Sequence, residues 1–189
     1  MRWLMGGQVY DVSTGSFRTA DIGIAHGRIA TVGSGARREH ADDTIDATGL
    51  WLLPGLIDCH VHLTLPTDAG DPAASANRSD AAIALYAAGA AARTLHAGIT
   101  TVRDVGGWNY VEMAVRDAVD SGSIPGPRMF LAGRLLSITT STVEYYPGMY
   151  EVADGVDAVR VAARRQLAKG ADLIKVMATG AMLSSETED

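Results

Sequence analysis

Two histidines separated by a single residue are the strongest candidates for chemistry in this sequence. His60 and His62 close the segment LLPGLIDCHVHL, residues 52–63, in which an apolar run passes through a Pro-Gly pair. In a strand, residues i and i+2 point to the same face, so the two imidazoles project together. Neutral imidazoles at this spacing can bind one metal ion, although two separately hydrogen-bonded histidines would give the same pattern. We predict that His60 and His62 bind the same divalent ion, zinc or another metal.

Lys175 is the second candidate. It lies in LIKVM, between Ile174 and Val176, in a strand that we expect to be buried on both faces. A buried ammonium group is costly unless it is paired or neutralised. Two interpretations follow. Lys175 pairs with a carboxylate, or its neutral amine reacts with carbon dioxide to give a carbamate, an anionic metal ligand with two oxygens.

Two carboxylates lie close to these residues in the sequence. Asp104 ends the strand TVRDVGG, where it either hydrogen-bonds a ligand histidine or caps the neighbouring loop backbone. Asp58 is either a partner of a ligand or a strand-end cap. Cys59 should point away from the two histidines into the core, because side chains alternate along a strand. The remaining histidines are expected in a turn, a charged loop and a helix end, and these are His26, His40 and His96.

The elements that must position these residues alternate between strand and helix. Apolar strands are predicted at 56–63, 99–107, 127–133 and 172–180, and helices at 78–97, 110–121 and 157–169. This alternation is typical of a parallel sheet buried on both faces. No glycine-rich phosphate signature follows the first strand, which disfavours a dinucleotide-binding fold. We therefore predict an α/β fold, the first half of a TIM-type (β/α)8 barrel, whose strands carry functional groups at their carboxyl ends.

Short strands are predicted before the barrel. A hairpin at 21–33 turns at His26-Gly27, because alternating runs flank an X-Gly pair, and a further strand fits 44–47. In the helix at 110–121, the residues predicted to form the buried apolar face are Val111, Ala114, Val115 and Ala118.

The composition excludes several classes of partner. The formal net charge is −6 at pH 7, so no electrostatic footprint for nucleic acid is present. No run approaches about 18 continuous apolar residues, so no membrane span is expected. The single cysteine permits no internal disulfide, and no signal peptide is expected. We predict a cytoplasmic protein that binds neither nucleic acid nor membrane.

Four segments together resemble the metal-dependent amidohydrolase superfamily, in its prolidase and imidazolonepropionase-like branch. They are DATGLWLLPGLIDCHVHL, HAGITTVRDVGG, PGPRMFLAGRLLSIT and KGADLIKVMATGAMLS. The resemblance implies that residues 1–53 are the N-terminal part of a β-sandwich domain and that residues 54–189 are the first four β/α units of the barrel. It also implies a pair of divalent metals, with His60 and His62 as ligands and carbamylated Lys175 bridging the ions. A bridging hydroxide would attack a carbonyl.

The sequence also departs from this family pattern. The family takes two more histidines and an aspartate, its general base, from later strands that this sequence does not contain. Thr142 stands where many relatives have a histidine, and Tyr145 and Tyr146 fall in the same loop. We treat these three as candidate substrate contacts; ordinary loop packing is the alternative for the tyrosines.

The predicted function is hydrolysis of an amide or other C–N bond in a peptide-like or cyclic amide substrate. Lys175 and Asp104 are the candidate catalytic residues in this chain. Activity would require the C-terminal half of the barrel, as a separate or cleaved chain, with Asp189 in the polar loop 184–189 marking the cleavage point. The alternatives are a tailoring amidohydrolase that cleaves a modified ribosomal peptide, a non-catalytic binding or regulatory fragment, a portion of a complete barrel, and a homo-oligomer.

Overall fold

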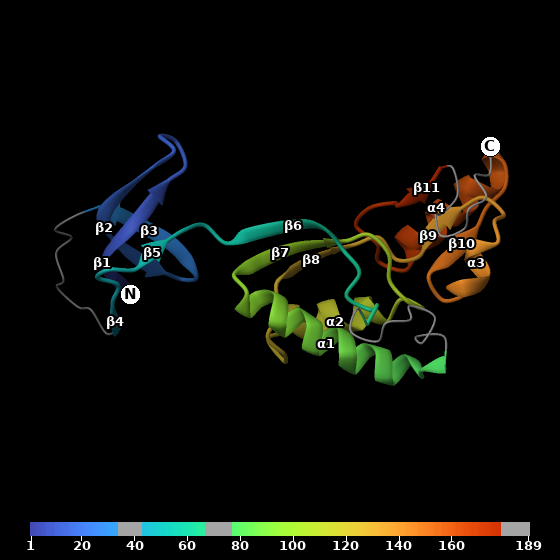
Figure 1. Cartoon of the computed structure of the whole chain (residues 1–189), viewed down its shortest axis with the longest axis horizontal. Coiled ribbons are helices and arrows are strands. Elements are labelled where there is room, and N and C mark those ends of the chain that lie inside the picture. The colour runs from blue at the N-terminus through green and yellow to red at the C-terminus, as the bar shows by residue number, and fades with distance from the viewer. Residues whose placement is uncertain (34–42, 67–76, 179–189) are drawn as a thin grey trace. The chain divides into compact units, whose positions relative to one another are not determined.

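The chain forms two compact units, Met1–Pro54 and Gly55–Asp189. The computed structural model describes residues 1–33, 43–66 and 77–178, apart from the side chain of Thr142 (Figure 1). The predicted loop position of His40 and the predicted cleavage loop at 184–189 lie outside these residues. Among the described helices, none combines the length and hydropathy needed to cross a bilayer.

The first unit is a single five-stranded sheet. Its strands are β1 (Arg2–Asp11), β2 (Ser16–Ala25), β3 (Arg28–Gly33), β4 (Asp43–Asp46) and β5 (Trp51–Leu52). The order is β3-β2-β1-β4, and β5 also pairs with β1. The predicted hairpin is confirmed, because β2 and β3 pair antiparallel around His26 and Gly27, whose φ angles are 52° and 71°. Positive φ at both central residues is the geometry of a two-residue hairpin turn. Within the described residues, the predicted sandwich is represented by this one sheet.

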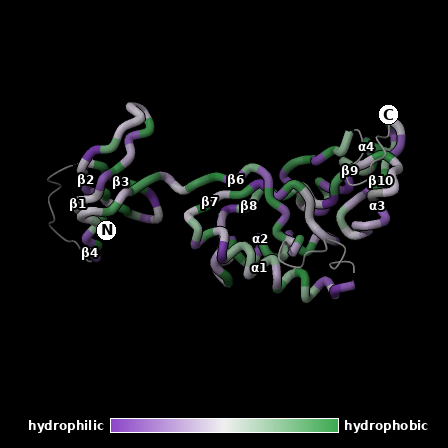
Figure 2. The backbone as a smooth tube through the Cα atoms, in the orientation of Figure 1, coloured by the Kyte–Doolittle hydropathy of each residue, from purple (hydrophilic) through white to green (hydrophobic). Residues whose placement is uncertain are grey.

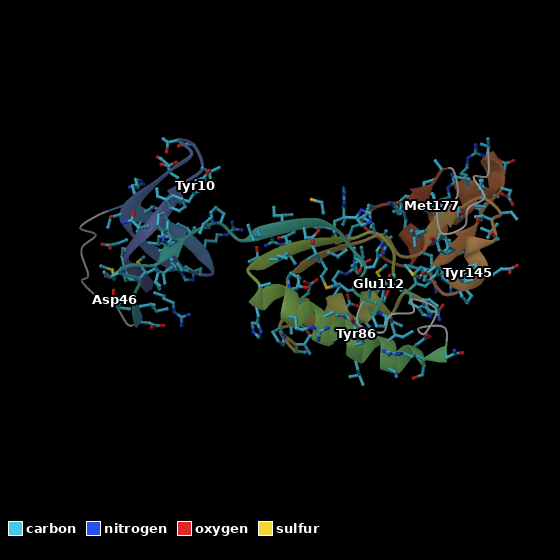
Figure 3. The ribbon with its side chains drawn as sticks, viewed as in Figure 1. Tyr10, Asp46, Tyr86, Glu112, Tyr145 and Met177 are labelled. Atoms are coloured by element: carbon cyan, nitrogen blue, oxygen red, sulfur yellow. The ribbon has the colours of Figure 1, made fainter. Side chains whose placement is uncertain are left out.

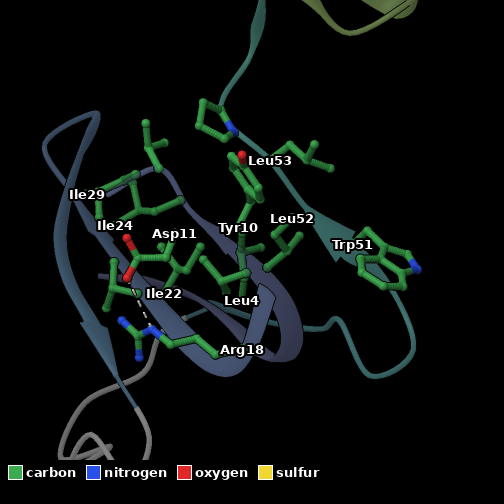
Figure 4. A pocket seen from close by; sticks show the side chains of 14 residues that line it. Leu4, Tyr10, Asp11, Arg18, Ile22, Ile24, Ile29, Trp51, Leu52 and Leu53 are labelled. Carbon is green, nitrogen blue, oxygen red and sulfur yellow. Dashed lines mark ion pairs between the residues drawn. The ribbon is translucent and has the colours of Figure 1, made fainter. Parts of the chain in front are cut away.

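One face of this sheet carries an apolar pocket of about 590 Å³ (Figure 4). Aliphatic side chains from β1, β2 and β3 and the residues of β5 line it. The ion pair Arg18 Nε–Asp11 Oδ2, at 3.8 Å, lies among the lining residues. Val9 and Ile22 in this lining are buried, whereas Trp51 and Leu53 remain 62% and 57% exposed.

The second unit begins with three parallel strands and two helices. These are β6 (Leu56–Val61), α1 (Asp80–His96), β7 (Ile99–Asp104), α2 (Val111–Asp120) and β8 (Arg128–Leu131). The strand order is β6-β7-β8, and both helices lie on the same side of the sheet in Figure 1. The core between them contains Leu63, Ala87, Ala91, Val102, Met113, Val115, Met129 and Leu131. The predicted α/β alternation and parallel sheet are confirmed here.

A second parallel sheet follows. Its elements are β9 (Leu135–Ser137), α3 (Thr142–Tyr145), β10 (Tyr150–Val152), α4 (Val156–Ala168) and β11 (Val176–Met177), and the strand order is β10-β9-β11. The first three fall in a stretch without clear periodicity, which is why the sequence did not predict them. The predicted strand at 172–180 is described only as the two residues of β11.

A kink after β8 joins the two sheets. β8 pairs with β7, whereas β9, which begins four residues after β8 ends, pairs with β11. Gly133, in the kink, has φ 71°, a conformation that favours glycine. Two hydrogen bonds connect the end of β8 to the chain before β11. The Asp172 carboxylate accepts from Leu131 N at 2.9 Å, and the Asp172 N–H donates to Leu131 O at 2.7 Å.

The predicted burial of β6 and of the strand around Lys175 is wrong for the described residues. The start of β6 is hydrophobic (Figure 2), yet Leu56 and Ile57 are 56% and 67% exposed, and Val176 in β11 is 51% exposed. Cys59 is also exposed and is not a core residue. The reason is that β6 has β7 as its one strand partner, so its other edge lacks cover within the described part of the chain.

The buried face of α2 differs in part from its prediction. Val115 is buried as predicted, but Ala114 is exposed, and Glu112 and Met113 are buried in addition. The helix is therefore rotated relative to the apolar pattern, and a carboxylate enters the protein interior.

Candidate metal centre

His60, His62 and Lys175 line one cavity of about 220 Å³ in the second unit. The two imidazole ring centroids are 5.5 Å apart, with an angle of 72° between the rings. Apolar and aromatic side chains form the rest of the described wall, and these are Leu65, Leu135, Tyr146, Met149, Tyr150 and Met177. The structure therefore brings together the three residues that the sequence singled out as metal ligands.

Different elements contribute these three residues. His60 lies in β6, and His62 follows that strand by one residue, as expected for functional groups near a strand's carboxyl end. Lys175 directly precedes β11, and its carbonyl accepts a hydrogen bond from Leu136 N at 2.9 Å. Because β11 pairs with β9, residues distant in sequence meet at this cavity.

The tautomer of His62 follows from its hydrogen bond. His62 Nδ1 lies 2.9 Å from the carbonyl oxygen of Gly106. A carbonyl only accepts, so Nδ1 carries the proton and Nε2 keeps a lone pair. Burial lowers the pKa of His62, the bond to Gly106 opposes this shift, and the positive Lys175 adds to it. The lowered pKa favours the neutral imidazole, in which the hydrogen bond to Gly106 leaves Nε2 available to a metal.

The surroundings of His60 shift its pKa in the same direction. Its loss of hydration, followed by the neighbouring His62 and then Lys175, lowers its pKa. Its backbone N–H donates to Asp58 Oδ1 at 3.0 Å, so Asp58 caps the strand backbone. Two neutral imidazoles and a lysine amine suit a divalent metal, the lysine as a carbamate. Within the described residues, no group of three or more His, Cys, Asp or Glu side chains forms a metal-binding cluster; Lys175 is thus needed for this donor set.

Asp104 supports the loops around the histidines. Its side chain is fully buried, and its carboxylate accepts from Leu63 N at 2.8 Å and from Gly106 N at 3.0 Å. Burial raises its pKa to about 7, against the effect of these two hydrogen bonds. Asp104 does not line the cavity. Of its two predicted roles, the structure shows the backbone contacts, which connect the loop after β6 to the loop after β7.

The candidate substrate residues lie in different places. Tyr146 is 8% exposed and lines the cavity, whereas Tyr145 is 59% exposed, does not line it, and is labelled at the surface in Figure 3. Thr142 begins α3, and its side chain lies outside the described part. Sequence reasoning missed Met149 and Tyr150, because they follow no helical or strand periodicity.

Comparison with known proteins identifies the family of this chain. Residues 51–189, well over half of the sequence, match the amidohydrolase family. The chain belongs to the amidohydrolase family. This confirms the resemblance carried by the four sequence segments, and the family is generally metal-dependent.

Several proteins similar to this amidohydrolase chain are longer than it. Ochratoxinase from Aspergillus niger is 30% identical over 164 residues, which cover 71% of this chain and 32% of that protein. The crystal structure of a prolidase complexed with N-methylphosphonate-L-proline is 29% identical with a TM-score of 0.83, covering all of this chain and 48% of that chain. The crystal structure of a Xaa-Pro dipeptidase with bound methionine is 28% identical with a TM-score of 0.81, covering 97% and 48%. The amidohydrolase chain thus spans about half of these structures.

Glu112 is a buried carboxyl that the sequence did not indicate, because a glutamate in the first turn of a helix usually faces solvent. In this amidohydrolase chain it is fully buried, and neither carboxyl oxygen accepts a hydrogen bond from another described residue. Burial raises its pKa to about 8, and Asp104 adds to the rise; the backbone N–H of Glu112 itself, followed by Arg116 and Arg134, opposes it. Glu112 is therefore mostly protonated at neutral pH.

Replacing Glu112 with glutamine should remove a pH dependence of stability. In the wild type, the folded state binds the Glu112 proton more tightly than the unfolded state, so the free energy of unfolding falls as pH rises from about 4.5 to about 8. The greatest slope for one group is about 1.4 kcal/mol per pH unit. Urea unfolding of both proteins at pH 5, 6.5 and 8 should show Glu112→Gln gaining relative stability at each step. A difference that is constant with pH would contradict this expectation.

Proposed function

We propose that this chain supplies part of the active site of a metal-dependent hydrolase that cleaves an amide or other C–N bond. The observation that carries the proposal is the convergence of His60, His62 and Lys175 on one cavity. Membership of the amidohydrolase family supports the same reaction class.

Each of the three residues has a proposed role. His60 and His62 bind a divalent metal through neutral imidazole nitrogens, and for His62 the nitrogen is Nε2. The Lys175 amine adds to carbon dioxide and loses a proton, which forms the N–C bond of an anionic carbamate with two donor oxygens. With zinc or another divalent metal bound, as one ion or two, the site would polarise a carbonyl and lower the pKa of water.

The cavity wall favours a substrate with an apolar or aromatic group beside the scissile bond. Tyr146, Met149 and Tyr150 form part of the cavity wall, and Met177, two residues after Lys175, also lines the cavity. Pockets of this composition bind ligands mainly by burying apolar surface. The names of the similar prolidase, Xaa-Pro dipeptidase and ochratoxinase support a peptide-like or cyclic amide substrate.

Completion of the site is a further part of the proposal. The chain corresponds to about half of the similar solved structures, and Leu56 and Ile57 on β6 remain largely exposed. We propose that the remaining half of the barrel, in the same precursor or in a second chain, covers β6 and supplies the missing metal ligands and general base. The cytoplasmic location remains a prediction.

Native purification followed by denaturing intact-mass spectrometry tests this proposal. The expected result is a zinc-containing assembly in which a second polypeptide accompanies this chain, and which releases amine from a panel of N-acyl-proline and N-acyl-phenylalanine amides. A chelator should stop the reaction, and added zinc should restore it. A zinc-loaded assembly that cleaves no C–N bond in the panel would favour the binding or regulatory alternative. If this chain alone is monomeric, cooperatively folded and active, the half-barrel interpretation is wrong.

A further inference from the structure

The Gly106–Gly107 peptide connects His62 to the rest of the fold through both of its polar groups. Its carbonyl oxygen, on Gly106, accepts from His62 Nδ1 at 2.9 Å. Its N–H, on Gly107, donates to the carbonyl oxygen of Gly133 at 2.9 Å. Because a peptide group is planar, the hydrogen bond to Gly133 fixes the direction of the carbonyl that meets His62.

Both glycines are tightly surrounded. A Cβ on Gly106 would overlap Leu135 and lie 3.3 Å from His62 Cε1, and a Cβ on Gly107 would overlap the carboxyl carbon and both oxygens of Glu112. Neither glycine is among the residues with positive φ. The sequence Gly-Gly is therefore required for space and not for backbone conformation.

Glu112 occupies the space next to Gly107, and no other residue in the described part of the chain donates a hydrogen bond to its carboxyl. Its side chain is 0% exposed, and neither carboxyl oxygen accepts a hydrogen bond from another described residue. A buried polar group without a partner costs free energy, so its presence calls for a role other than stability. Being uncharged at neutral pH, the carboxyl lies against the glycine backbone as a polar wall.

We propose that Glu112 is a positioning residue of the candidate metal centre. Its carboxyl supports the Gly106–Gly107 peptide, and that peptide holds His62 with the proton on Nδ1 and with Nε2 available to the metal. The inference rests on the proposed function for its metal, but the tautomer of His62 is a property of this chain and is measurable without metal.

The test combines nuclear magnetic resonance with zinc titration. Histidine labelled with ¹⁵N in the natively purified, metal-free protein reports the His62 tautomer, and His62→Gln assigns the signal. Competition with a chelator gives the zinc affinity. We expect the wild type and Glu112→Gln, which has the same shape and no charge, to show the Nδ1-protonated form and equal zinc affinity within about threefold.

Gly107→Ala and Glu112→Ala should each disturb this arrangement. The first places a Cβ where the carboxyl lies, and the second removes the wall. Each should mix the tautomers and weaken zinc binding roughly 10- to 100-fold, the usual effect of losing a partner that orients a ligand histidine. The double variant Gly107→Ala/Glu112→Ala should bind zinc more tightly than Gly107→Ala alone. In the double variant, the Cβ added at position 107 enters the space that the Glu112 carboxyl occupied.

Met113→Ala is the matched control, because Met113 is the next residue on α2 and packs in the apolar core of the β6–β8 sheet. It should lower stability without changing the tautomer or the zinc affinity. If Glu112→Ala, like Met113→Ala, leaves the tautomer and the zinc affinity unchanged, the positioning role is overturned. This comparison tests the role even if Gly107→Ala does not fold. Tautomer mixing in Glu112→Gln equal to that in Glu112→Ala would overturn it too. A wild-type protein that binds no zinc contradicts the proposed function. The His62 tautomer measured in the metal-free variants still tests the positioning role of Glu112.

Discussion

Replacing His60 and His62 together with alanine is expected to abolish zinc binding by the assembled protein. Both imidazoles line the same cavity, with ring centroids 5.5 Å apart, and the surroundings lower the pKa of both, which favours the neutral form that binds metal. The loss of affinity should exceed about 100-fold, the upper end of what loss of a supporting partner alone causes. Elemental analysis of the purified protein and chelator competition measure this change.

The controls for this experiment are histidines outside the cavity. His26 lies in the β2–β3 turn and His96 ends α1, and both are exposed. The double variant His26→Ala/His96→Ala removes the same number of imidazoles and should keep the wild-type zinc content. Unchanged zinc stoichiometry after loss of His60 and His62 would place the metal elsewhere and contradict the proposed site.

Replacing Lys175 with alanine should remove hydrolytic activity. If the carbamate of Lys175 holds the metal in its reactive position, its loss should lower kcat/KM on the order of 1000-fold, which corresponds to about 4 kcal/mol of transition-state stabilisation. A short carboxylic acid such as propionate should restore part of the activity, because its two oxygens can replace those of the carbamate. The rate of amine release, measured with and without propionate, tests both expectations.

Lys169 offers a matched control for this variant. It is the other lysine of the sequence, and its ammonium lies 5.8 Å from the centre of the Tyr110 ring, outside the cavity lining. Lys169→Ala should keep wild-type activity and should not respond to propionate. A structure of the metal-loaded protein in which Lys175 is a free amine distant from the metal would contradict the carbamate.

The parts of the site that the sequence predicts are those where one residue conflicts with its surroundings. His60 and His62 interrupt an apolar run with a two-residue spacing, and Lys175 places a charge between Ile174 and Val176. The alternation of strands and helices was predictable for a related reason, because apolar periodicity follows the geometry of each element.

The remaining features depend on tertiary contacts that leave no local pattern. Met149 and Tyr150 reach the cavity from a stretch without periodicity, and Glu112 is buried although its helix position normally faces solvent. The exposure of Leu56 and Ile57 could not be predicted either, since an apolar strand has the same composition whether or not a neighbour covers it.

The kink after β8 also determines how the second unit can open locally. One stretch of chain pairs with β7 before Gly133 and with β11 after it, and the carbonyl of Gly133 accepts from the glycine loop beside His62. Neither sheet can therefore separate from this stretch without loosening the loop that orients the histidine. The amide hydrogens of Gly107, Ala132 and Leu136, all of which form hydrogen bonds here, should exchange with solvent in one cooperative opening, although Gly107 and Ala132 lie outside the helices and strands.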